Sequence, residues 1–130
     1  MRQSIAALVV LGVLALPAGA RSAPTEQTFV VRTTGDLAAL CADTSASDPM
    51  MTAAQNFCEG FMVGAYQVLQ QVDVARAKRA FCVPTPPPTR TAAIASFVQW
   101  AQANPSETAR APADGVFEFL TQRFPCRAKP

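Results

Sequence analysis

Apolar residues recur at helical spacing through the middle of the chain. They fall at Phe57, Phe61, Ala65, Val68 and Val72. Steps of three or four residues place side chains on one stripe of an α-helix. The sequence therefore predicts a central helix that buries this stripe. Asp48-Pro49 marks its start, since aspartate caps helices and proline suits the first helical position, and we expect the helix to reach about residue 77.

Two glycines interrupt this central helix. Gly60 and Gly64 stand four residues apart and so share one helix face. Each weakens a helix by about 0.8–1 kcal/mol relative to alanine, which calls for a compensating contact. We predict that they form a shallow strip where a neighbouring helix packs or a partner approaches closely.

Threonines mark the starts of two further helices. Thr34 as N-cap and Asp36 in the first turn predict a short helix that ends at Cys41. Thr89 predicts a second helix with one apolar face. The expected buried residues are Leu37, Leu40 and Cys41 in the first helix, and Ile94, Phe97, Val98 and Ala101 in the second.

A last helix is expected from residue 111 or 112 to residue 124. Its predicted apolar stripe is Val116, Phe117, Leu120 and Phe124, with Phe119 off the stripe. No stretch alternates apolar and polar residues as a strand would. The sequence thus predicts an all-α fold, a small bundle of about four helices in a single domain over residues 34–126.

The N-terminus has the pattern of a secretory signal peptide. Arg2 precedes an uncharged apolar run over residues 5–16, and small residues follow up to Ala20. The run is shorter than the roughly 20 residues of a membrane span. We therefore expect cleavage after Ala20, export to the periplasm and no membrane attachment afterwards, with an uncleaved anchor as the alternative. A flexible leader over 21–33, with an extended piece at 29–31, and a tail over 127–130 flank the domain.

Charge and composition exclude several functions. Removal of residues 1–20 leaves ten of the eleven basic residues against nine acidic ones, whereas a nucleic-acid binder needs a concentrated basic face. The chain has no histidine, the commonest general base and zinc ligand. Glu59, next to Cys58, points about 100° away from it on a helix and is expected to be exposed. We predict no enzyme, metal or cofactor.

Four cysteines in an exported chain predict two disulfides, which three pairings allow. Cys58 and Cys82 would lie about 30 Å apart along the central helix, whereas a disulfide needs Cα atoms within about 7 Å. A short loop returns the chain from Cys41 to Cys58, which disfavours the pairing of Cys41 with Cys82. If the last three helices alternate in direction, Cys126 meets Cys82. We predict Cys41–Cys58 and Cys82–Cys126.

Several short motifs follow one another over residues 34–126. They are Phe57-Cys58-x-Gly60-Phe61-x-x-Gly64, Phe81-Cys82-Val83-Pro84, Asn104-Pro105-x-Glu107, Pro112-Ala113 and Phe124-Pro125-Cys126. Their order and spacing resemble the Rap/Tai immunity-protein family. Asn104 stands where that family commonly has histidine, and Pro86-Pro87-Pro88 replaces more ordinary residues.

The resemblance implies an exported immunity protein that inhibits a peptidoglycan amidase delivered by type VI secretion. A second copy of the chain is a further candidate partner. A periplasmic stress or chaperone-like role is the alternative, although few carboxylates and no histidine disfavour an acid switch. Candidate contacts lie in two proline-braced loops, because such loops lose little conformational entropy on binding. The alternative is that both loops are ordinary connectors. Their residues are Thr85, Pro86, Pro87 and Pro88 in one, and Asn104, Pro105 and Glu107 in the other.

Overall fold

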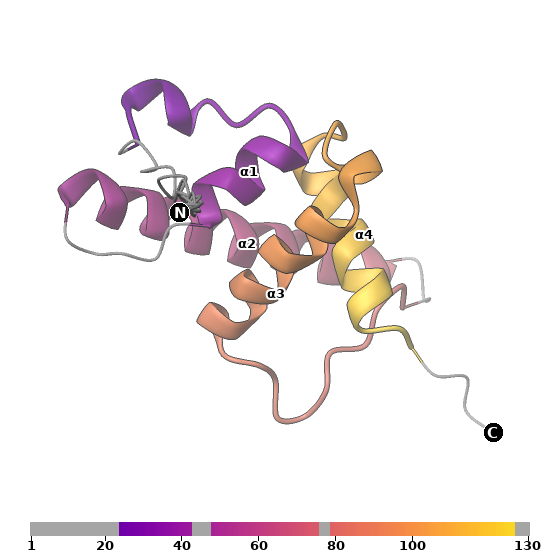
Figure 1. Ribbon diagram of the computed structural model, residues 1–130. Coiled ribbons are helices and arrows are strands. Elements are labelled where there is room, and N and C mark those ends of the chain that lie inside the picture. The colour runs from indigo at the N-terminus through magenta and orange to yellow at the C-terminus, as the bar shows by residue number, and fades with distance from the viewer. Residues whose placement is uncertain (1–23, 43–47, 76–78, 127–130) are drawn as a thin grey trace, which may run out of the picture.

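The computed structural model describes residues 24–42, 48–75 and 79–126. These ranges contain helices and no strand, which confirms the all-α prediction (Figure 1). The expected signal peptide over 1–20, the tail over 127–130 and the end of the central helix beyond residue 75 lie outside them. The elements are η1 (Glu26–Phe29), α1 (Thr34–Cys41), α2 (Pro49–Ala75), α3 (Arg90–Ala103), η2 (Pro105–Glu107) and α4 (Pro112–Arg123).

The short helix α1 packs against all three of the other α-helices (Figure 1). Its Leu37 is fully buried and Leu40 is nearly so. The hydrophobic core therefore gathers around α1, although α2 is more than three times as long. The core cluster consists of Leu37, Ala38, Cys41, Cys58, Met62, Phe81, Phe97, Ala101, Val116, Phe119 and Leu120.

Side-chain caps begin the helices close to where the sequence predicts. The Asp48 carboxylate accepts a hydrogen bond from the Met50 N–H at 2.7 Å, and Thr89 Oγ1 accepts one from the Ala92 N–H at 3.2 Å. The predicted starts of α2 and α3 are thus confirmed.

The cap of α1 lies one residue earlier than expected. Thr33 Oγ1 accepts from the Asp36 N–H at 3.1 Å, and the Asp36 carboxylate accepts from the Thr33 N–H at 2.9 Å. Thr34 is instead fully buried, and its hydroxyl donates to the carbonyl oxygens of Arg110 and Ala111. The prediction of Thr34 as cap is wrong because the segment before α4 supplies better partners for its hydroxyl.

The buried face of α2 differs from the predicted stripe. Ala54, Cys58 and Met62 are buried, whereas Val68 is 59% and Val72 36% exposed. The disulfide of Cys58 turns its side of the helix toward α1, so the stripe that includes the two valines lies partly outside the core.

Phe119 is buried to 1% exposure, and Phe117 is only half-buried, so the predicted stripe of α4 is also wrong at these two positions. The Phe119 ring meets the Phe97 ring edge-on at a centroid distance of 5.6 Å and lies 5.9 Å from the Trp100 ring. The face of α4 that carries Phe119 is therefore the one that meets α3.

The glycines that pack closely are not the predicted ones. A Cβ at Gly60 or Gly64 would have no neighbouring atom within 4 Å in the described structure, apart from α2's own nearby backbone, so the expected packing of another helix there is not found. A Cβ at Gly115 would overlap the Thr34 side chain. The close helix approach is thus between α1 and α4.

Part of the expected leader is helical rather than extended. The 3-10 helix η1 spans Glu26–Phe29. The ring of Phe29 meets the ring of Phe57 edge-on, with centroids 5.8 Å apart. An aromatic contact with α2 therefore holds this part of the segment against the bundle.

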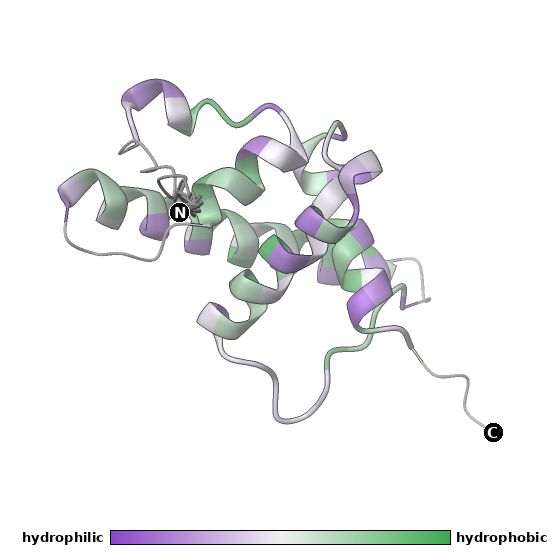
Figure 2. Cartoon of the chain, in the orientation of Figure 1, coloured by the Kyte–Doolittle hydropathy of each residue, from purple (hydrophilic) through white to green (hydrophobic). Residues whose placement is uncertain are grey.

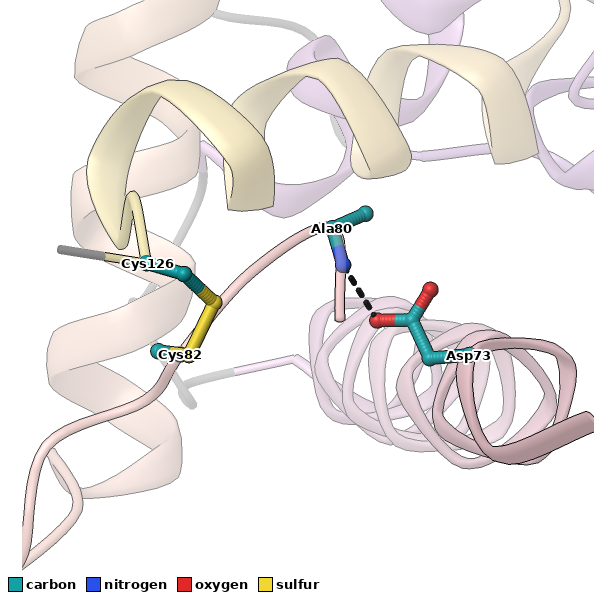
Figure 3. Close-up of a disulfide and its surroundings, with 4 residues drawn as sticks. All are labelled: Asp73, Ala80, Cys82 and Cys126. Atoms are coloured by element: carbon teal, nitrogen blue, oxygen red, sulfur yellow. Dashed lines mark hydrogen bonds between the residues drawn. A yellow bond between two sulfur atoms is a disulfide. The ribbon is translucent and has the colours of Figure 1, made fainter. Parts of the chain in front are cut away.

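Both predicted disulfides are confirmed. Cys41 and Cys58 join α1 to α2 with Cα atoms 5.5 Å apart. Cys82 and Cys126 join the segment after α2 to the residues after α4, with Cα atoms 4.8 Å apart (Figure 3).

Candidate functional site

The described residues that precede α3, 79–89, project from the helices as a loop (Figure 1). Residues 84–88, here called the proline loop, are all exposed and contain four prolines. The residues that lead into it, Phe81 to Val83, are hydrophobic, and Phe81 is buried (Figure 2). The proline loop thus rises from an apolar base.

That base is fixed to the ends of two helices. The Cys82 N–H donates to the Phe124 carbonyl oxygen at 2.7 Å, next to the disulfide between Cys82 and Cys126. The Ala80 N–H donates to the carboxylate of buried Asp73 at 2.8 Å (Figure 3). Since Thr89 caps α3 directly after the loop, the proline loop is held at both ends.

A hollow of about 380 Å³ opens between the proline loop, α2, α3 and α4. The loop contributes Pro87 and Pro88, and most of the other lining residues are apolar. Those from the helices include Met62, Val63, Ile94, Val116, Phe119 and Leu120.

A second hollow, of about 370 Å³, lies between α2 and α3 beside the disulfide of Cys41 and Cys58. Glu59 and Ile94 line both hollows, so the two adjoin. We call the combined depression the α2–α3 groove. Its lining residues come from segments that precede and segments that follow the proline loop in the sequence.

The groove contains few charges. Among the described residues, the charged ones that line the larger hollow are Glu59 and Arg90, and the one that lines the smaller hollow is Glu59. In the described part of the chain both ion pairs involve Arg110, so Glu59 pairs with no described cation. Glu59 is half-buried rather than exposed as expected.

The second predicted loop lies at the other end of α3, about 20 Å away along a helix of 14 residues. The Asn104 amide donates to the Trp100 carbonyl oxygen at 2.8 Å, and Glu107 forms an ion pair with Arg110 at 3.0 Å. Pro105 is exposed. The structure therefore does not bring the two predicted loops together, and a role of the second loop in partner binding stays a prediction.

The sequence did not reveal the groove because its walls come from segments far apart in the chain. Glu59 offered one signal: a carboxylate directly after a disulfide-bonded cysteine lies beside the core rather than opposite it. Among the described residues, no three His, Cys, Asp or Glu side chains are grouped as a metal site would require. No described helix is long and apolar enough to cross a membrane.

The family model of the Rap1a immunity proteins matches residues 33–126. The chain belongs to the Rap1a immunity protein family. The matched span contains both disulfides and the four α-helices that the described residues form in this Rap1a-family protein, and the match confirms the resemblance seen in its motifs. No curated protein and no solved structure shows significant similarity to the chain.

Proposed function

We propose that this Rap1a-family protein is exported to the periplasm and there binds and inhibits a peptidoglycan amidase delivered by type VI secretion. The observation that carries the proposal is the family match over residues 33–126. The signal-peptide pattern over residues 1–20 supports export. Two disulfides suit the oxidising periplasm.

The protein acts by binding, without chemistry of its own. The chain has no histidine to serve as a general base. Glu107 and Glu118 both pair with Arg110 and so serve the fold. A proline loop that is fixed at both ends loses little conformational entropy when a partner covers it, which suits an inhibitor.

The test takes peptidoglycan amidases of the type VI secreted class as candidate effectors, with any that is encoded beside this gene tried first. Cells that direct the effector to their periplasm are grown with and without the full chain, and purified proteins are mixed to measure the complex. We expect protection and a stable complex. A chain that lacks residues 2–20 should still bind in solution but should not protect cells, since it stays in the cytoplasm.

If the full chain formed no complex and gave no protection, the proposed function would be contradicted. Binding in solution without protection of cells would contradict export or inhibition, since a bound but active amidase also leaves the cells unprotected. Light scattering of the purified chain, alone and with the effector, measures whether a second copy is also a partner.

A further inference from the structure

We propose that the α2–α3 groove is the surface that receives the partner, and that it takes a protein segment with apolar side chains and one lysine or arginine that pairs with Glu59. This inference rests on the proposed function, because it assigns the docking surface of the same inhibitor. The proline loop forms one wall of the groove and so makes only part of the proposed contact with the partner.

The first argument is the apolar lining. Val63 and Ile94 are half-buried residues that line the groove, and Phe119 belongs to the core beneath it. Burial of such surface by a partner contributes free energy roughly in proportion to the apolar area covered. Apolar depressions with few polar groups are typical of docking sites.

The second argument is the charge of Glu59. This carboxylate lies where the two hollows adjoin and has no ion pair within the described chain. A segment that covers the groove removes water from Glu59, which is costly unless a cation replaces the water. Arg90, which lines the larger hollow, disfavours a cluster of cations. Charge complementarity therefore selects a segment with one basic side chain opposite Glu59.

The third argument is length. The residues of α2 that line the groove run from Gln55 to Gln70, about 22 Å of helix at 1.5 Å per residue. The groove follows α2 along this length, with α3 opposite it in the smaller hollow and the proline loop, α3 and α4 around the larger one. An elongated depression along a helix suits a segment of polypeptide, as in other grooves that receive peptides.

The probe is the purified amidase that forms the complex in the test of the proposed function. Glu59→Lys reverses the groove charge, and Glu26→Lys makes the same change at an exposed residue of η1 as the control. Ala93→Trp fills the groove from α3, and Ala103→Trp adds the same bulk at the exposed end of that helix. We expect the two groove variants to weaken the complex by about tenfold or more, as for a lost charge pair, with the controls close to wild type.

Hydrogen exchange of the wild-type complex gives a result that does not depend on variants folding. We expect the effector to slow amide exchange over residues 59–70 of α2 and 90–95 of α3. Groove variants that fold and bind like wild type, or unchanged exchange in these segments of a formed complex, would overturn the inference and leave the proposed function intact. Slowed exchange there in concentrated chain without effector would show that a second copy fills the groove, which also overturns it. Absence of binding by the wild-type chain contradicts the proposed function and the inference together.

Discussion

The side chain of Thr34 occupies the space that a Cβ of Gly115 would need. The Thr34 hydroxyl also donates to the Arg110 and Ala111 carbonyl oxygens, both at 3.1 Å. One buried threonine thus fixes the start of α1 against the start of α4, although 80 residues separate the two contact points in the chain.

Gly115→Ala should destabilise the protein by about 1–3 kcal/mol, because the added methyl group must displace the buried Thr34 side chain. Gly60→Ala and Gly64→Ala are the matched controls. They face open space and should stabilise the protein by about 0.5–1 kcal/mol each through higher helix propensity. Urea unfolding of the three variants measures the contrast. A Gly115→Ala variant as stable as the two controls would contradict the close approach of α1 and α4.

Thr34→Val keeps the shape of the side chain and removes its hydroxyl. We expect a loss of about 0.5–1.5 kcal/mol, the usual net value of a hydrogen bond. The loss should stay in this range because both carbonyl oxygens keep a backbone donor: Arg110 accepts from the Thr34 N–H and Ala111 from the Gly115 N–H. Thr91→Val, at an exposed position of α3, should change stability by less than about 0.5 kcal/mol. Equal effects of the two changes in thermal unfolding would argue against a role for the buried hydroxyl.

The two disulfides should differ in their contribution to stability. They close loops of 17 and 44 residues, which correspond to about 3 and 4 kcal/mol in the chain-entropy description. The double serine variant at Cys82 and Cys126 should therefore lose more than the one at Cys41 and Cys58. Guanidinium unfolding of both variants tests the order, and the reverse order would show that loop entropy does not govern it.

Asp73→Ala should destabilise the protein by about 1–3 kcal/mol, since it leaves the Ala80 N–H without its acceptor. The change also loosens the base of the proline loop, so amide exchange at residues 80–83 should quicken. Gln71→Ala, at an exposed position of the same helix, is the control and should stay within about 0.5 kcal/mol of wild type. Unchanged exchange at residues 80–83 would mean that the disulfide alone holds the loop base.

Stability should depend on pH through Asp36. Hydrogen bonds from the Arg32 N–H and from Thr33 hold the pKa of the Asp36 carboxyl below its ordinary value of 3.8. A lowered folded-state pKa contributes stability that is fully present above the unfolded value and is lost as the pH falls through the folded value. The stability difference between wild type and Asp36→Asn should thus be constant from pH 7 to about pH 5 and shrink below 3.8. A difference that persists unchanged at pH 2 in thermal melts would refute this role.

Local signals in the sequence predicted where α2 and α3 begin, and together with the expected helix directions they predicted the cysteine pairs. The caps at Asp48 and Thr89 depend on residues within four positions, and helix length alone separates Cys58 from Cys82. Contacts between helices were not predictable in this way. Phe119 and Gly115 owe their burial to α3 and α1, which the periodicity of α4 does not encode.

The groove was less accessible to sequence reasoning than the fold. The proline loop was predicted as a candidate contact, and Pro87 and Pro88 do line the larger hollow. Glu59 and Ile94 were not predicted as part of the same surface, because the disulfide of Cys58 decides which side of α2 faces the core. A periodic pattern shows which residues share one face of a helix, but it does not show which face the neighbouring helices cover.

The disulfide connectivity has a consequence for synthesis. Each cysteine pairs with its neighbour in sequence, the first with the second and the third with the fourth. Chains emerge from ribosomes and secretion channels N-terminus first, and domains begin to fold in that order. In the proposed periplasmic setting, an oxidase that joins cysteines as they appear would therefore make Cys41–Cys58 before Cys82 is exposed, and the native pairs would form without any shuffling of bonds.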